Sequence, residues 1–291
     1  MFTSVLMASR PISWINTAFP FAAGYLMVTR EIDTLFVVGT VFFLIPYNLL
    51  MYGINDVFDY ESDLANPRKG GIEGAVADRT RAAQVHRAIL LWSLLSVVPF
   101  SVWMMTLSDA AAAATLALVI GTAVAYSAPV LRFKERAFVD SATSATHFMG
   151  PLLYGLVAAH ADLGSAWVWP ILAAFFLWGM ASHALGAVQD IQADRSGGIG
   201  SVATVIGARS TVRLSVALYV AAAVLLLALP WPGMLASVLP LPYAVSAARF
   251  WNIDDARAPD AHGAWKTFLW LNQPVGFVVT MLLIAVWNGW L

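Results

Sequence analysis

"TLFVVGTVFFLIPYNLLMYGI" occupies residues 34–54 and is followed at once by the acidic stretch "NDVFDYESD" at residues 55–63. The first stretch carries no charge and is long enough for an α-helix to cross a hydrocarbon core about 30 Å thick. The second stretch places four acids where that helix ends. Together the two stretches predict a transmembrane helix whose acidic end needs a partner or an ion, because unpaired charges are costly near lipid.

The composition of the whole chain is also strongly hydrophobic. Of its 291 residues, 60% are hydrophobic and 11% charged, and the mean hydropathy is +0.74. Soluble domains carry about 25% charged residues, so this is a polytopic membrane protein. The absence of cysteine excludes disulfides, thiolate metal sites and a cysteine nucleophile. No signal-peptide pattern opens the chain, so we expect the first apolar segment to be retained.

Nine segments are long and apolar enough to span a membrane when about 20 residues per helix are required. They are residues 11–29, 35–55, 86–106, 110–127, 138–159, 167–189, 211–229, 232–250 and 267–290. We therefore expect an all-α fold of nine transmembrane helices, bundled around a central cavity in a single domain over residues 1–291.

The basic residues predict the orientation of these segments. Fifteen of the 16 Lys and Arg residues fall in alternate connections, and only Arg30 lies on the other side. Positive residues stay on the cytoplasmic side, so we expect a cytoplasmic N-terminus and an external C-terminus. The external connections, such as "REID" and "PWPG", are too short for a domain. The expected location is the plasma membrane, with the active site facing the cytoplasm.

Two inner connections resemble each other and indicate a divergent internal repeat. One reads "NDVFDYESDLANPRKGGIEG" and the other "QDIQADRSGGIGS". At about 100° per residue, Asp56, Asp59 and Asp63 lie within about 60° of one another on a helix. Asp190 and Asp194 are likewise one turn apart. Each set is therefore expected to line one face at the C-terminal end of its helix.

Carboxylate and amide oxygens are ligands that Mg²⁺ prefers, and a helix C-terminus favours a cation. Basic side chains follow both sets and can bind phosphate oxygens. They are Arg68, Lys69, Arg132, Lys134 and Arg195. Together they indicate a phosphorylated substrate that enters from the cytosol, and we expect no nucleic-acid partner. Taken alone, the first stretch is equally explained as a solvated acidic turn, and we expect Glu61, Glu73, Asp254 and Asp255 to be solvated.

Three further polar residues have two interpretations each. His183 lies seven residues before Asp190, near the same helix face, and could take a proton or line an acceptor pocket. A histidine that hydrogen-bonds between helices is the simpler interpretation. His147 and Asn16 have the same two interpretations.

Carboxylates inside a membrane also mark ion pathways, so a cation-coupled transporter is an alternative function from another class.

At these motifs the chain resembles the UbiA superfamily of intramembrane prenyltransferases. The first Asp-rich motif of that superfamily corresponds to Asn55, Asp56, Asp59 and Asp63, and the second to Asp190 and Asp194. Its Tyr-Ser-x-Pro signature corresponds to Tyr126, Ser127 and Pro129, and its opening Arg-Pro to Arg10 and Pro11. The resemblance implies an allylic diphosphate held by two Mg²⁺ ions on the six motif residues. It also implies that Tyr126 lies near the diphosphate or the carbocation, that Arg132 or Lys134 binds phosphate, and that Ser127 lines the cavity.

Within the superfamily, the stretch "YGINDVFDYESDLANPRKGGIEGA" is most similar to lycopene elongases. This similarity implies dimethylallyl diphosphate as the donor, lycopene dissolved in membrane lipid as the acceptor, and a possible downstream carotenoid cyclase. The alternative within the superfamily is transfer of a longer prenyl chain to an aromatic or quinone precursor. Whether the new cation is quenched by water or by loss of a proton stays open.

Overall fold

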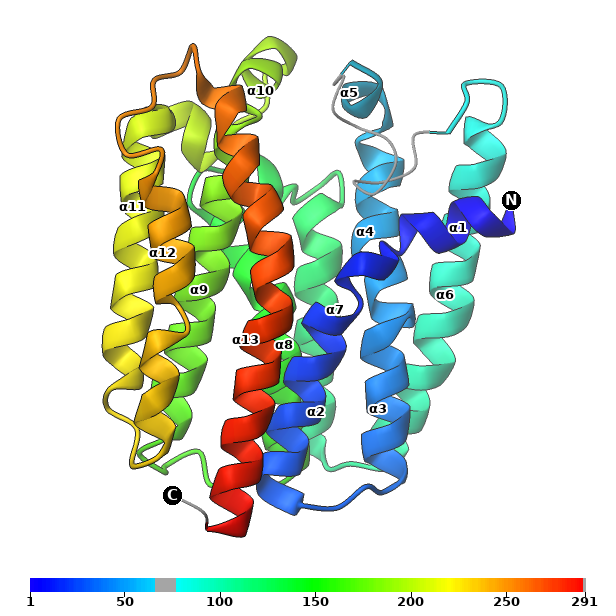
Figure 1. The fold of residues 1–291 in the computed structure, drawn as a ribbon. Coiled ribbons are helices and arrows are strands. Elements are labelled where there is room, and N and C mark those ends of the chain that lie inside the picture. Colours follow the sequence, from blue (N-terminus) through cyan, green and yellow to red (C-terminus); the bar gives the residue numbers. More distant parts are fainter. Residues whose placement is uncertain (66–76, 290–291) are drawn as a thin grey trace. The chain divides into compact units, whose positions relative to one another are not determined.

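Every regular element in residues 1–65 and 77–289, the part of the chain that the computed structural model describes, is a helix (Figure 1). The first half contains α1 (Phe2–Ala8), η1 (Pro11–Ser13), α2 (Ile15–Thr29), α3 (Thr34–Leu44), α4 (Pro46–Phe58), α5 (Tyr60–Ala65), α6 (Ala82–Thr106) and α7 (Ala110–Ser127). The second half contains η3 (Phe133–Glu135), α8 (Val139–Ala158), α9 (Val168–Val188), α10 (Ile191–Gly197), α11 (Val202–Leu226), η4 (Gly233–Val238), α12 (Leu241–Ala248), η5 (Ala258–Ala261) and α13 (His262–Asn288).

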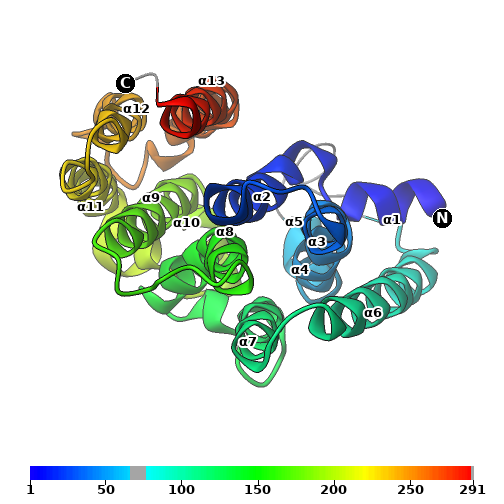
Figure 2. The ribbon, with the colours of Figure 1, turned by 90° about the horizontal axis from the view of Figure 1, so that it is seen from below.

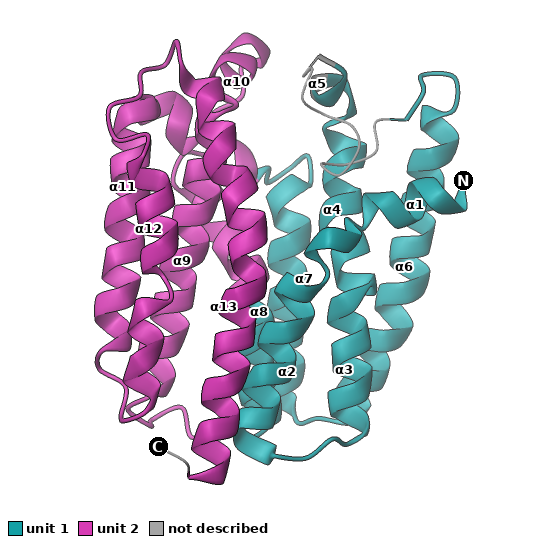
Figure 3. Ribbon diagram, in the orientation of Figure 1, with its two compact units in different colours: residues 1–132, 150–161 teal, residues 133–149, 162–291 magenta. Residues whose placement is uncertain are grey.

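The chain divides into two compact units (Figure 3). Unit 1 comprises residues 1–132 and 150–161, and unit 2 comprises residues 133–149 and 162–291. Helix α8 contributes its first part to unit 2 and its second part to unit 1. The interpretation of the whole chain as a single domain stays a prediction.

Each of the nine predicted segments overlaps a helix or a pair of helices, although α11 and α13 begin before the predicted starts at residues 211 and 267. The second segment is the pair α3 and α4, and the eighth is η4 followed by α12. By length and composition, six helical stretches of the described chain can cross a membrane: residues 34–58, 82–106, 110–127, 168–188, 202–226 and 258–288. The count of nine and the orientation stay predictions. Helix α1 was not predicted, because it is too short to show a periodic pattern.

Helix α6 shows why the fold needs lipid around it. Its side chains Trp92, Leu94 and Val102 are each more than half exposed. Soluble monomers rarely expose a contiguous apolar surface of this kind. The exposed apolar face of α6 therefore supports a multi-pass membrane protein.

A proline divides the second predicted segment. Pro46 opens α4, and the break leaves the last carbonyl groups of α3 without N–H partners from their own helix. The fully buried Asn48 side chain donates through Nδ2 to the carbonyl oxygens of Phe43 at 2.8 Å and Leu44 at 3.1 Å. Thr17 of α2 donates to the same Phe43 carbonyl at 2.7 Å. This polar group therefore joins α2 to the kink.

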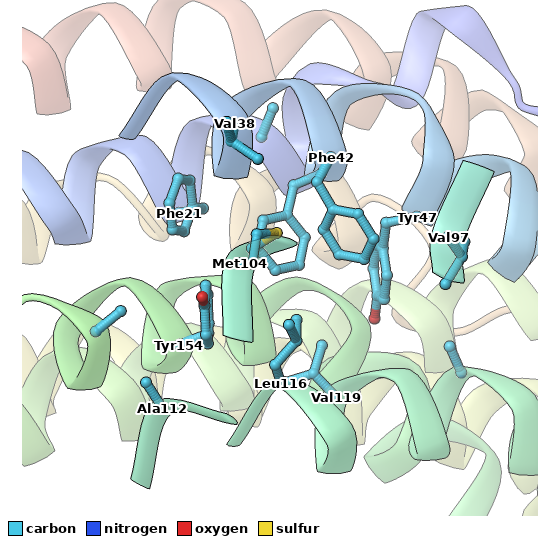
Figure 4. Close-up of a cluster of buried hydrophobic side chains, with 14 of the residues drawn as sticks. Phe21, Val38, Phe42, Tyr47, Val97, Met104, Ala112, Leu116, Val119 and Tyr154 are labelled. Carbon is cyan, nitrogen blue, oxygen red and sulfur yellow. The ribbon is translucent and has the colours of Figure 1, made fainter. Parts of the chain in front are cut away.

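The core of unit 1 contains a group of aromatic rings among aliphatic side chains (Figure 4). The rings of Phe21 on α2, Phe43 on α3 and Tyr154 on α8 all contact one another. The centroid of Phe21 lies 5.2 Å from that of Phe43 and 5.7 Å from that of Tyr154, and the last two are 5.8 Å apart. Helices α2 and α8 approach closely at Gly155, where an added Cβ would come within 2.6 Å of the Phe21 carbonyl oxygen. Gly155 is therefore required for this contact.

The core of unit 2 forms mainly between α9 and α11, which lie side by side with α12 next to α11 (Figure 2). Trp178 of α9 stacks on Phe268 of α13, with ring centroids 5.5 Å apart. Ser182 and the buried Tyr219 hydroxyl are 2.9 Å apart and join α9 to α11. These contacts hold α9, the helix that leads to the second Asp motif, in a fixed place within unit 2.

The polar group at the kink predicts a stability effect. Asn48→Leu keeps the branching and the number of side-chain heavy atoms but leaves the Leu44 carbonyl without its side-chain donor, so we expect a loss of about 1–2 kcal/mol in unfolding free energy. Thermal unfolding in detergent measures it. Asn288→Leu is the matched control, because Asn288 is exposed and bonds only within its own helix end. Equal unfolding temperatures for the two variants would contradict the role of Asn48.

Candidate active site

The first Asp motif lies in unit 1 where α4 gives way to α5. Asp59 is the residue between the two helices, and its φ of −101° and ψ of 2° interrupt the predicted single helix. Its N–H still donates to the Asn55 carbonyl at 2.9 Å, and the Asp63 N–H donates to the Asp59 carbonyl at 2.8 Å. The motif residues therefore keep their one-turn spacing across a break that the sequence did not predict.

Asp56 is the most enclosed acid of this motif, with 7% of the residue exposed. Arg10 donates through Nη2 to its Oδ1 at 2.6 Å. The Arg10 guanidinium also lies over the Tyr52 ring, 4.9 Å from the centroid. The backbone of Arg10 is left-handed, with φ at 51°, which turns the chain between α1 and η1. The sequence marked Arg10 only as an inner charge and a signature residue, and its contact with Asp56 was missed.

Two predicted residues, at the end of α7 and just after it, contact the same motif. The buried Ser127 donates through Oγ to the Asn55 side-chain oxygen at 3.1 Å. Arg132 Nη2 lies 3.5 Å from Asp59 Oδ1. Tyr126, half-buried, directly precedes Ser127. Unit 1 therefore gathers a motif amide, two motif carboxylates and two arginines.

The second Asp motif lies in unit 2 between α9 and α10. Asp190 is the N-cap residue of α10, and the Asp194 N–H donates to its carbonyl at 2.8 Å. Asp194 Oδ2 accepts from the Ser201 hydroxyl at 3.4 Å. The carboxylates are thus one turn apart, as predicted, but they follow the end of α9 in a new short helix. Both motifs therefore occupy a break after a long apolar helix.

Arg195 has a partner that the sequence did not indicate. Its Nη1 lies 2.7 Å from Asp255 Oδ2, and its Nη2 donates to the Thr204 carbonyl at 3.1 Å. Asp255 Oδ1 also accepts from the Ala208 N–H at 2.7 Å, just after Gly207, whose φ of 79° breaks α11. The pKa of the Asp255 carboxyl is held below its ordinary value. The largest cause is the hydrogen bond from the Ala208 N–H, and the next is the hydrogen bond from Arg195. Asp255, expected to be only solvated, is a helix cap.

The remaining predicted residues lie in several places. His183 Nδ1 and the Ser141 hydroxyl of α8 are 3.1 Å apart, which confirms the interpretation of a histidine bonded between helices. Asn16 is half-buried in α2, His147 is buried in α8, and Lys134 lies in η3 of unit 2. Arg68, Lys69 and Glu73 lie outside the described residues. The pocket roles of Asn16 and His183 stay predictions.

Asp140 is a buried acid that sequence reasoning missed. It lies in the first turn of α8 and is fully buried. Its Oδ1 accepts from the Ser141 N–H at 2.7 Å, and its Oδ2 accepts from the Val202 N–H at the start of α11 at 2.8 Å. A lone Asp with no motif around it gave no signal of this role. Asp140 therefore joins the start of α8 to the start of α11. The start of α11 follows the second Asp motif closely in the sequence.

In the described part of the chain, no three His, Asp or Glu side chains are close enough to hold a metal by themselves. The donor chemistry nonetheless fits Mg²⁺, because this ion usually takes one or two carboxylates and completes its shell with water and phosphate oxygens. Each unit provides such carboxylates at its own helix break. The magnesium site stays a prediction on these residues.

Comparison with known proteins identifies the class. The sequence model of the UbiA prenyltransferase family matches residues 17–273. The chain belongs to the UbiA prenyltransferase family. This confirms the predicted resemblance and the enzyme class, and it favours both over the transporter alternative.

Two curated relatives of this UbiA member are similar over nearly all of the chain. A lycopene elongase/hydratase from Corynebacterium glutamicum is 54% identical over 282 residues, which cover 97% of this chain and 96% of the relative. The C(50) beta-cyclic carotenoids biosynthesis protein LbtBC from a Dietzia species is 48% identical over 99% of this chain and 66% of the relative.

The fold is that of solved UbiA structures. A UbiA homolog from Archaeoglobus fulgidus bound to GPP and Mg²⁺ has a TM-score of 0.68 at 18% identity, covering 95% of this chain and 99% of that one. The same homolog bound to DMAPP and Mg²⁺ has a TM-score of 0.65, covering 95% and 98%. The all-helical membrane fold is therefore confirmed.

The Asp255 cap predicts a pH-dependent stability. Since folding lowers the pKa of Asp255, its stabilising effect is present above about pH 3.9, the ordinary pKa, and is lost as the pH falls through the lowered value. Asp255→Ala should lower the unfolding temperature by about 2–4 °C at pH 7 and by less at pH 3. Asp254→Ala is the control from the same loop. A gap that stays constant with pH would refute the mechanism.

Proposed function

We propose that this UbiA family member transfers the C5 dimethylallyl group from its diphosphate to lycopene, towards C50 carotenoids. The observation that carries the proposal is the 54% identity, over 97% of the chain, to a lycopene elongase/hydratase. Both Asp motifs are complete in this sequence. We place the enzyme in the plasma membrane, with the diphosphate entering from the cytoplasmic side.

The proposed donor site uses the carboxylates of both motifs. Two Mg²⁺ ions would be held, directly or through water, by Asn55, Asp56, Asp59 and Asp63 of the first motif and by Asp190 and Asp194 of the second. Arg10 occupies only one of the lone-pair positions of Asp56, and a carboxylate has about four, so Asp56 can keep Arg10 and still bind a cation. The homolog of the same fold that binds DMAPP with Mg²⁺ supports this donor.

Release of the diphosphate requires compensation of its growing negative charge. Bound Mg²⁺ would neutralise that charge and lower the barrier to loss of the diphosphate. Arg132, 3.5 Å from Asp59, is a described basic side chain of unit 1 that could bind the same oxygens. Tyr126, beside the Ser127 that orients Asn55, presents a polar hydroxyl and an aromatic face at the end of α7.

The acceptor then reacts with the allylic cation. A terminal double bond of lycopene supplies the electron pair for a bond to C1 of the donor, which leaves a tertiary cation on the former alkene. That cation either takes up water and releases a proton or loses a proton directly. Apolar and aromatic side chains must exclude bulk water until the new bond has formed. His183, two turns before Asp190 on α9, is the proposed cavity residue closest in sequence to the second motif.

The motif acids can be tested directly. Asp56→Ala and Asp190→Ala should each reduce prenyl transfer by at least about 100-fold, because each removes a carboxylate from the donor site. The measurement is incorporation of labelled dimethylallyl diphosphate by membranes that contain equal amounts of each protein. Glu61→Ala is the matched control, since Glu61 is an exposed acid between two motif residues. Full activity of either motif variant would overturn the site.

The acceptor is tested in a host that accumulates lycopene. Expression of the chain should convert lycopene into pigments heavier by one or two five-carbon units, with or without added water, as read by mass analysis. Membranes supplied with 4-hydroxybenzoate serve as the comparison. Labelling of that aromatic acid with no change in lycopene would replace the carotenoid proposal by the quinone alternative.

A further inference from the structure

Unit 2 carries a groove that the prenyl-transfer chemistry does not use. It has a volume of about 630 Å³ and lies along α11, with Leu177 of α9 on one side. Its lining is almost entirely apolar, and its two polar-tipped residues are Arg213 and Trp251. No residue of either Asp motif lines it. The groove is thus distinct from the candidate active site.

The shape of the groove follows from the sequence of α11. Small residues, Ala217 and Ala221, stand one turn apart, and the larger Val220 and Val224 beside them are 43% and 59% exposed. This arrangement leaves an open groove on the surface of α11 that runs from Arg213 to Leu225, roughly 18 Å along the helix axis. A groove of that length and chemistry fits an extended hydrocarbon chain.

One end of the groove is positively charged. The Arg213 guanidinium lies 5.1 Å from the centre of the Trp251 ring and donates only to neutral oxygens, the Trp251 carbonyl and the Asn252 side chain. Within residues 1–65 and 77–289, no carboxylate forms an ion pair with Arg213. Arg213 and Trp251 are both exposed. The positive charge at this end is therefore available to an anion.

We propose that this groove binds an anionic glycerophospholipid, with one acyl chain along α11 and the headgroup phosphate against Arg213. The charge at one end and the apolar groove behind it match the two parts of such a lipid. Basic pockets beside membrane helices bind anionic headgroups, and each nearby Arg contributes about 1 kcal/mol to that attraction. Trp251 has the amphipathic ring that is typical of the headgroup region.

The charge of the lipid provides the first test. The purified full chain in detergent is mixed with phosphatidylglycerol or phosphatidylcholine of the same acyl composition, and bound lipid is counted by native mass spectrometry. The wild type should retain more phosphatidylglycerol, and Arg213→Gln should reduce that retention about fivefold. Arg257→Gln is the matched control, because Arg257 is an exposed arginine that pairs with Asp260. It should retain lipid like the wild type.

The apolar part of the groove provides the second test. Ala217→Phe fills the groove and should lower the retention of phosphatidylglycerol even though Arg213 is present. Ala111→Phe, an exposed alanine of α7, adds the same volume elsewhere and should have no effect. Unfolding temperatures of all variants establish that they are folded.

Two results would overturn the lipid site. One is equal retention of the two lipids by the wild type, and the other is unchanged phosphatidylglycerol retention in both Arg213→Gln and Ala217→Phe. Prenyl transfer is measured separately on the same proteins. Neither Arg213 nor Ala217 belongs to the Asp motifs. A failure of the lipid site would therefore leave the proposed prenyl transfer unaffected, and the reverse also holds.

Discussion

A carboxylate at the end of an apolar helix needs a cation or a hydrogen-bond donor close to it, because charge near the hydrocarbon layer is costly. Asp56 shows this constraint most clearly: it is 7% exposed and lies 2.6 Å from Arg10. Breaking a buried pair of this kind costs about 3–5 kcal/mol, because the remaining charge stays uncompensated. The pair therefore fixes the N-terminal turn of the chain against α4 and holds the first motif in place within unit 1.

The second constraint comes from the break in the helical backbone that each motif includes. Irregular backbone near lipid is tolerated only where protein or water satisfies its polar groups. In unit 1, α4 and α5 keep hydrogen bonds across Asp59. In unit 2, the short α10 is held to α11 by the bond from Arg195 to the Thr204 carbonyl and by the contact of Ser201 with Asp194. The Asp-rich helix ends are thus shaped by neighbouring helices as well as by their own residues.

Local features of the chain could be predicted from its sequence, and long-range contacts could not. Apolar length placed the helices, and one-turn spacing placed the acids of both motifs, because both depend on neighbouring residues. The Arg10–Asp56, Arg195–Asp255 and Asp140–Val202 contacts join residues 46, 60 and 62 positions apart. A single sequence carries no record of such pairs. The break at Gly207 was missed for the same reason, since its cap comes from Asp255.

Arg195, a predicted phosphate ligand, and Arg10, which pairs with Asp56, differ in how easily they exchange partners. Arg195 and Asp255 are 47% and 40% exposed, and a pair at that exposure contributes about 0–1 kcal/mol, so a diphosphate can displace Asp255 at little cost. Arg10 is enclosed with Asp56, and its release would leave a buried charge. We therefore expect Arg195 to move to an arriving diphosphate, whereas Arg10 stays with Asp56 and keeps that carboxylate oriented. Both arginines would support prenyl transfer, but only Arg195, the exposed one, would bind the diphosphate by exchanging its partner.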